Sequence, residues 1–201
     1  MSFYHNLITQ KSFEELKKLR QTTDFILIGG WAVYFYTHQL KSKDIDIITD
    51  YAQLEKIGRN YQLTKNERLK KYEARRDEVQ IDIYLPFYSN LGIPVEVLQK
   101  QTQTVENFTL LEANYLTALK IHTFNQRGQI PKGQKDFLDV VSLLTSPWVD
   151  TKKVKEVVKK YQIKTDLWEK RAKETNQIPE LNLNTHRWAR IKRQKGLCRG
   201  K

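Results

Sequence analysis

The first half of the chain carries its apolar residues in short runs or in strict alternation, which is the pattern of β-strands. Continuous apolar runs predict strands over residues 24–28 and 44–49. Residues 78–85 alternate apolar and polar side chains and predict a third strand, with one face turned to the core. Further strands are expected at 61–64, 68–73 and 108–110, and helices at 31–40 and 52–59.

From Glu112 onward the apolar residues recur every three or four positions, which predicts helices. We expect them at 112–127, 137–144, 152–161 and 164–177. Near the start of the chain, Ser12 followed by Glu15 fits a capping box and predicts a helix that begins at Ser12. The fold class is therefore α/β (α+β): a small mixed-sheet core over 1–110, a helical part over 111–147, and a basic helical C-terminal region over 148–201.

The net charge of +12 is concentrated in the last quarter of the chain. Residues 1–150 hold 19 Lys/Arg and 18 Asp/Glu, whereas residues 151–201 hold 16 Lys/Arg and 5 Asp/Glu. This asymmetry favours a polyanion as partner, chiefly RNA, although a solvated basic face has the same composition. Two readings of Trp188 stay open: it stacks on RNA bases, or an amphipathic helix packs Trp168 and Trp188 onto the main domain.

The composition sets further limits. Hydrophobic residues make up 39% of the 201, which is enough for a packed core. A single cysteine, Cys198, excludes a disulfide within one chain, fits the reducing cytoplasm, and has no visible base partner that would make it a nucleophile. We expect no signal peptide and no membrane partner, because no apolar run approaches the roughly 20 residues that span a bilayer. The four histidines have no zinc-binding spacing.

Two aspartates, Asp44 and Asp46, stand in the second apolar run, where charge is costly to bury. In an extended strand they share one face, while Ile45 points to the other. Two carboxylates so close repel each other unless a cation lies between them, and Mg²⁺ is the usual partner of paired carboxylates and a phosphate. A strand end whose acids face water is the alternative.

Two other features strengthen the case for a catalytic site. Gly29-Gly30 follows the first strand, where glycines let backbone amides approach a ligand and the helix that follows favours a phosphate. Asp82 lies in the alternating strand, and as a third carboxylate beside Asp44 and Asp46 it would complete a two-metal site. An ordinary tight turn and a solvated edge-strand acid are the alternatives.

These residues resemble the nucleotidyltransferase signature of the DNA polymerase β superfamily: Gly29-Gly30-Trp31-Ala32, Asp44-Ile45-Asp46 and Asp82. Downstream, the segment from Tyr115 to Lys120, then Arg127, then Gln134 to Asp139 resembles the AbiEii-type branch. That branch includes the toxins of type IV toxin–antitoxin systems. The resemblance covers roughly residues 24–145, and the Gly-Gly-Trp start is also similar to aminoglycoside nucleotidyltransferases.

The resemblance implies a role for each matching residue. Gly29 and Gly30 would line the triphosphate, and Asp44, Asp46 and Asp82 would hold two Mg²⁺ ions. Lys120 would meet triphosphate oxygens, and Asp136 would lie near the nucleotide or the acceptor, with Lys135 and Asp139 as second-choice neighbours. A snorkelling surface lysine and a helix-start acid are the alternatives for Lys120 and Asp136. Relatives often carry an arginine before the aspartate pair, where this chain has Lys41-Ser42-Lys43; Lys43 can still neutralise a phosphate, and Ser42 could contact one.

The implied reaction is Mg²⁺-dependent transfer of NMP from an NTP to an acceptor hydroxyl. The basic C-terminal region favours RNA as acceptor, and the toxin branch implies the tRNA 3′ end and a cognate antitoxin protein as partner. One alternative keeps the chemistry but transfers NMP to an aminoglycoside-like small molecule or to a protein side chain. The other alternative is a nucleic-acid-binding module without catalysis.

Overall fold

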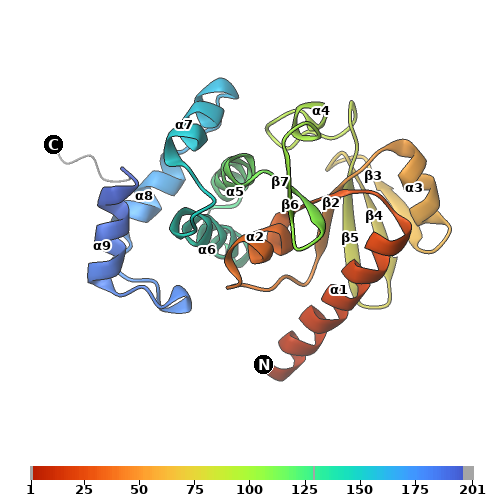
Figure 1. The fold of residues 1–201 in the computed structure, drawn as a ribbon, viewed down its shortest axis with the longest axis horizontal. Coiled ribbons are helices and arrows are strands. Elements are labelled where there is room, and N and C mark those ends of the chain that lie inside the picture. Colours follow the sequence, from red (N-terminus) through yellow and green to blue (C-terminus); the bar gives the residue numbers. More distant parts are fainter. Residues whose placement is uncertain (1, 129, 197–201) are drawn as a thin grey trace. The chain divides into compact units, whose positions relative to one another are not determined.

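The computed structural model describes residues 2–128 and 130–196, and the chain divides into two compact units, Met1–Glu112 and Ala113–Lys201. The first unit combines a mixed sheet with helices, and the second is built from helices (Figure 1). The predicted α/β class is confirmed. Cys198 lies outside the described residues. No helix in the described part of the chain is long and apolar enough to cross a membrane.

The first unit is organised around one sheet of seven strands in the order β3-β4-β5-β2-β1-β7-β6. The strands are β1 (Ile26–Ile28), β2 (Ile45–Ile48), β3 (Gln62–Asn66), β4 (Lys71–Arg76), β5 (Val79–Tyr84), β6 (Thr102–Val105) and β7 (Phe108–Leu111). In the centre, β2 runs antiparallel to β1 and parallel to β5. The strands predicted from apolar runs are therefore the middle of the sheet, where both faces need cover.

Four helices belong to this unit: α1 (Ser2–Thr22), α2 (Gly29–Thr37), α3 (Tyr51–Gly58) and α4 (Val95–Leu98). In Figure 1, α1 crosses the sheet at β5, α2 follows β1 directly and packs on β1 and β2, and α3 lies beside β3. The core side of the central strands is formed by isoleucines that are almost completely buried. The face that alternates with these isoleucines carries the polar residues of β2 and β5.

The prediction that the first helix begins at Ser12 is wrong. Helix α1 starts at Ser2, so Ser12 lies in its middle, fully buried. Its hydroxyl Oγ accepts a hydrogen bond of 2.9 Å from the indole Nε1 of Trp31 in α2. Serine is favoured at helix starts because its side chain competes for backbone groups, but a buried indole N–H needs an acceptor as well. The serine of this apparent capping box therefore joins two helices.

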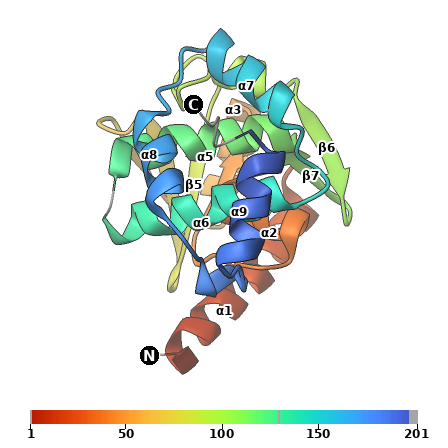
Figure 2. The same ribbon diagram turned by 90° about the vertical axis from the view of Figure 1, so that its left-hand side faces the viewer.

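The second unit contains α5 (Ala113–Arg127), α6 (Pro131–Thr145), α7 (Thr151–Lys160), α8 (Asp166–Glu174), the 3₁₀ turn η1 (Pro179–Leu181) and α9 (Thr185–Gln194). Helices α5 and α6 lie side by side in both views, and α7 and α8 also pack on α5 (Figures 1 and 2). The rings of Phe124, Phe137 and Trp168 form one aromatic cluster between α5, α6 and α8.

Two tryptophans of this unit, Trp168 and Trp188, face its interior, whereas Trp148 is exposed. Trp188 is 0% exposed and donates a hydrogen bond of 3.0 Å from Nε1 to the backbone oxygen of Thr175, while Trp168 is 2% exposed. Of the two readings of these rings, packing holds, but the partners of both rings lie within the helical unit itself. Stacking of Trp188 on RNA bases is excluded in this arrangement, because the ring offers no accessible face.

Candidate active site

Two of the predicted carboxylates lie side by side on the sheet. Strands β2 and β5 are parallel and in register, so that Asp46 pairs with Asp82. The alternation of both strands buries Ile45, Ile47, Ile81 and Ile83 on one face and leaves Asp46 and Asp82 half-buried on the other. Neighbouring strands are about 4.8 Å apart. Two carboxylates at this separation repel each other, and a bound cation would relieve the repulsion.

Asp44 is placed differently from the prediction of a strand over 44–49. It lies in the bend immediately before β2, with an exposed side chain, so the pleat of the sheet does not set its direction. Within residues 2–128 and 130–196, no three His, Cys, Asp or Glu side chains come together in an arrangement that could hold a metal ion. The donor chemistry nevertheless fits a hard divalent cation: Asp46 and Asp82 are set by the sheet, and Asp44 is supplied by the adjoining loop.

Gly29 touches this site directly. It is the first residue of α2, with a φ of +67° that residues with a side chain rarely adopt. A Cβ at this position would overlap the carboxylate of Asp46, which pairs across β1 and β2 with Ile28. The residue before α2, Ile28, provides no side-chain cap for the first turn. Backbone N–H groups at a helix start are favourable for anions, so this turn could receive a phosphate next to Asp46.

Lys71 is the residue of the site that sequence reasoning missed. It begins β4, its side chain is only 8% exposed, and its Nζ lies 2.5 Å from Oδ2 of Asp82 and 3.2 Å from Oε1 of Glu73. The side-chain amide of Gln80 donates to Oδ1 of Asp82 at 2.7 Å, so both oxygens of this carboxylate have a partner. Hydrogen bonds from Asn66 and from Lys71 lower the pKa of Glu73 below its ordinary value.

The signal for Lys71 in the sequence was weak. It follows two other basic residues closely, and nothing in a run of lysines and arginines marks the one that becomes buried. The alternation Lys71-Tyr72-Glu73 would have placed Lys71 and Glu73 on one face of a strand. Only the pairing of β4 with β5, however, brings that face onto Asp82.

A second group of charged residues forms within the helical unit. Lys120 Nζ lies 3.3 Å from Oδ1 of Asp136 and 2.7 Å from Oδ2 of Asp139. Both carboxylates are buried, at 3% and 0% exposure, and Lys120 is 12% exposed. Arg127 Nη1 approaches the other oxygen of Asp136 at 2.8 Å. Within the described residues, Oδ1 of Asp139 has no hydrogen-bond partner. Neither a snorkelling surface lysine nor a helix-start acid describes this cluster, because Asp136 lies in the second turn of α6 and is buried.

The predicted site residues thus fall into two groups. Gly29, Asp46 and Asp82 come together in the first unit. Asp44 lies on the adjoining bend, and Gly30, which follows Gly29 in α2, is buried. Lys120, Asp136 and Asp139 come together in the second unit, where Lys135 is half-buried one residue before Asp136. Lys43 is exposed, next to Asp44.

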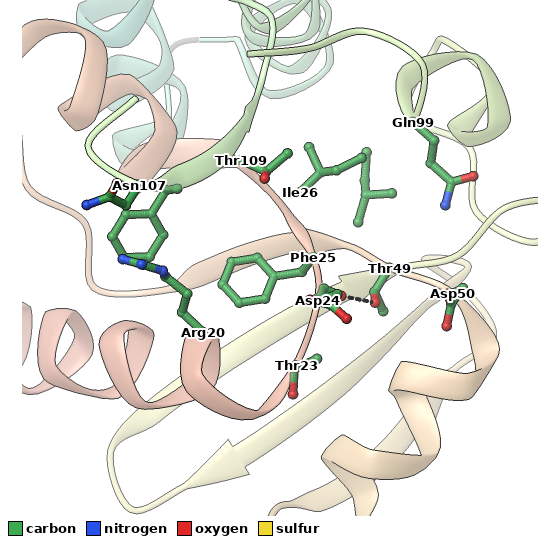
Figure 3. A pocket seen from close by; sticks show the side chains of 12 residues that line it. Arg20, Thr23, Asp24, Phe25, Ile26, Thr49, Asp50, Gln99, Asn107 and Thr109 are labelled. Atoms are coloured by element: carbon green, nitrogen blue, oxygen red, sulfur yellow. Dashed lines mark hydrogen bonds between the residues drawn. The ribbon is translucent and has the colours of Figure 1, made fainter. Parts of the chain in front are cut away.

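A pocket of about 430 Å³ in the first unit is separate from Asp46 and Asp82 (Figure 3). It is lined by Ile26 and Ile48, which pair with each other, whereas Asp46 pairs with Ile28 at the other end of the same strands. Two of the lining residues, Arg20 and Phe108, contact each other: the guanidinium carbon lies 4.9 Å from the centre of the ring. The dashed line in Figure 3 is the 2.8 Å hydrogen bond from Thr49 Oγ1 to the backbone oxygen of Asp24. This pocket is therefore not the carboxylate site.

Comparison with solved structures identifies one protein with a shared fold. The solution structure of the antibiotic-resistance factor ANT(2'')-Ia is similar with a TM-score of 0.54 and 13% identity, over 87% of this chain and 100% of that one. JHP933 from Helicobacter pylori has a TM-score of 0.49 and 14% identity, over 94% and 93%. The Megavirus polyadenylate synthase has a TM-score of 0.49 and 11% identity, over 71% of this chain and 32% of that one.

Comparison with models of protein families and with curated proteins gives no match. At 13% identity, the likeness to ANT(2'')-Ia establishes a shared fold and not a shared substrate. The other two scores are too low to support any conclusion. Function must therefore be argued from the residues of the site.

Proposed function

We propose that this protein is a metal-dependent nucleotidyltransferase that transfers NMP from an NTP to an acceptor hydroxyl and releases pyrophosphate. The observation that carries the proposal is the in-register pair of Asp46 and Asp82 on neighbouring strands, with the Gly29 turn against Asp46. The nucleotidyltransferase fold shared with ANT(2'')-Ia supports it. Lys71 already lies against Oδ2 of Asp82, so a Mg²⁺ ion would share this carboxylate with the Lys71 ammonium group.

In this proposal, Asp44, Asp46 and Asp82 hold two Mg²⁺ ions. When bound, such ions activate the attacking hydroxyl and offset the charge that develops on the triphosphate. Lys71 and Gln80 act as positioning residues, because they hold both oxygens of Asp82 in one orientation. The first-turn amides of α2, at Gly29 and Gly30, receive a phosphate of the NTP.

Lys43 and Lys120, which the resemblance assigns to the phosphates, differ in their surroundings. Lys43 is exposed and can approach a phosphate directly. Lys120 is shared between Asp136 and Asp139, so a triphosphate would compete with these two carboxylates for its ammonium group. We propose that Lys120 and Lys135 contact the triphosphate and that Asp136 lies near the nucleotide or acceptor.

RNA is the proposed acceptor. Its support is the excess of Lys and Arg over residues 151–201 and the exposure of most of these side chains on α7, α8 and α9. Phosphate contacts of this kind supply affinity without sequence specificity. The tRNA 3′ end and a role as a toxin with a cognate antitoxin remain proposals that rest on the resemblance of the sequence.

The test is incubation of the full chain with total RNA, Mg²⁺ and each NTP in turn, radiolabelled at the α-phosphate. We expect one labelled RNA band, with no labelling by Asp46→Asn. Asp77→Asn is the matched control, because Asp77 is exposed in the β4–β5 turn with a positive φ that asparagine tolerates. Labelling that survives Asp46→Asn would contradict the assigned site.

The same assay separates the acceptors. Label that appears on the protein itself, or only when an aminoglycoside replaces the RNA, would reject RNA as the acceptor while retaining the chemistry. Absence of label with every NTP and acceptor, together with RNA binding, would favour the non-catalytic alternative. Growth arrest on induction of the wild type, but not of Asp46→Asn, is the result expected of a toxin.

A further inference from the structure

A groove of about 450 Å³ runs along the second unit between α7 and α8, with the end of α9 at its side. Its floor is apolar and comes from four helices. The residues that form this floor are Ile121, Leu144, Val154, Val158 and Trp168. All of them are buried except Val158, which is partly exposed. Val158 is therefore the floor residue with an accessible aliphatic side chain, and the one aromatic ring, Trp168, is 2% exposed.

Lysines surround this floor without acidic partners. The lining contains Lys155, Lys159, Lys173 and Lys195 against a single acid, Glu169, which is a net charge of +3. Within the described part of the chain, none of these lysines forms an ion pair with a carboxylate, in contrast to Lys120 of the same unit.

Among residues 2–128 and 130–196, two of the four lysines bond only to neutral backbone groups. Lys155 donates to the backbone oxygen of Gly196 at 3.5 Å, and Lys195 donates to that of Val149 at 3.2 Å. These contacts hold the two ammonium groups at the rim and leave their charge uncompensated. An uncompensated ring of cations around apolar surface favours a partner that is both acidic and apolar.

We propose that this groove binds an acidic amphipathic helix of a partner protein. A helix of this kind buries its apolar stripe in a hydrophobic groove and places its carboxylates at the edges. Lys155 and Lys159 are four residues apart and stand on one edge of α7, while Lys173 of α8 belongs to the opposite wall. The ten residues of α7 extend for about 15 Å, so about three turns of a bound helix lie along the groove.

The chemistry of the groove favours a peptide over a nucleic acid. Single strands of nucleic acid are held by exposed aromatic rings and by arginine planes as well as by phosphate contacts. The basic residues of this lining are all lysines, and its aromatic ring is covered, whereas the aliphatic side chain of Val158 is partly exposed. An aliphatic floor gains nothing from a phosphate backbone but gains from leucine or isoleucine side chains of a helix. This inference does not depend on the proposed catalytic activity.

The test uses a fluorescently labelled synthetic helix of about three turns, with leucines at helical spacing on one face and glutamates on both flanks. Its binding to the full chain is measured by fluorescence anisotropy. The double variant Lys155→Glu/Lys159→Glu should weaken binding about tenfold or more, because two attractive contacts become repulsive. The matched control is Lys152→Glu/Lys153→Glu, which reverses two exposed lysines of the same helix outside the groove and should change binding less than about threefold.

A second variant tests the floor without any change of charge. Val158→Ser alters a partly exposed residue, and it should weaken peptide binding severalfold while circular dichroism shows the native helix content. Equal losses in the two double variants would overturn the proposal, since they would indicate attraction to net charge alone. Equal binding of a peptide with scrambled leucine positions would overturn it too. The proposal would also be overturned if an RNA oligomer displaced the peptide and its binding were lost in Lys155→Glu/Lys159→Glu but not in Lys152→Glu/Lys153→Glu.

Discussion

Replacement of Gly29 by alanine tests the contact between the α2 turn and Asp46. The backbone of Gly29 has a φ of +67°, and an L-residue in this region costs about 1–2 kcal/mol. The new Cβ would also overlap the Asp46 carboxylate, so the side chain or the start of α2 must shift, at a further cost of about 1–3 kcal/mol. We therefore expect Gly29→Ala to lower the free energy of unfolding by about 2–5 kcal/mol.

Gly128→Ala provides the control for the backbone cost alone. Its φ is +62°, and a Cβ there would meet no atom within 4 Å, so only about 1–2 kcal/mol should be lost. Urea unfolding gives both values. In the labelling assay the rate of labelling by Gly29→Ala should be about 100-fold lower than that of the wild type, because a displacement near 1 Å of a catalytic group has an effect of this size. Gly128→Ala should label at the wild-type rate. If Gly29→Ala retains wild-type stability and labelling, the close approach to Asp46 is refuted.

Three further changes test other parts of the structure. Ser12→Ala removes the acceptor of the buried Trp31 indole and should cost about 1–3 kcal/mol in urea unfolding, whereas a loss below about 0.5 kcal/mol would reject the hydrogen bond. Lys120→Ala leaves the buried Asp139 without a cation, while Asp136 keeps Arg127, and should cost about 3–5 kcal/mol, unlike the exposed Lys132→Ala. Lost activity alone would therefore not prove a phosphate contact. Burial lowers the pKa of His122 below its usual 6.5, so the unfolded chain binds more protons and stability should fall as the pH drops through 6.5. His122→Gln should flatten that part of the thermal stability profile, and an unchanged pH dependence would contradict the assignment.

Local patterns were sufficient for the central strands. The apolar runs around Ile28 and Ile47 and the alternation around Ile81 correspond to β1, β2 and β5, because buried strands need apolar residues whatever their partners are. The same alternation put Asp46 and Asp82 on polar faces. The sequence did not contain the strand order, so their side-by-side placement followed only from the parallel pairing of β2 with β5.

The errors have a common physical cause. Ser12 has the side chain of a helix cap, yet α1 continues through it because burial against Trp31 satisfies the hydroxyl in another way. Lys71 looked like any surface lysine until β4 paired with β5. Strand β6 was missed because Thr102–Val105 is polar on its open side and pairs only with β7. In each case a contact between distant segments decided the role of a residue that its neighbours in sequence could not indicate.

The central claim is that the carboxylates on β2 and β5 serve nucleotidyl transfer. The most direct measurement is a comparison of NTP labelled at the α-phosphate with NTP labelled at the γ-phosphate, for the wild type, Asp46→Asn and Asp77→Asn. We expect the acceptor to retain the α-label and not the γ-label with the wild type and with Asp77→Asn. With Asp46→Asn we expect no label on the acceptor. Retention of the γ-label would indicate phosphoryl transfer, and α-labelling by Asp46→Asn would show that the chemistry occurs elsewhere; either result would contradict the account.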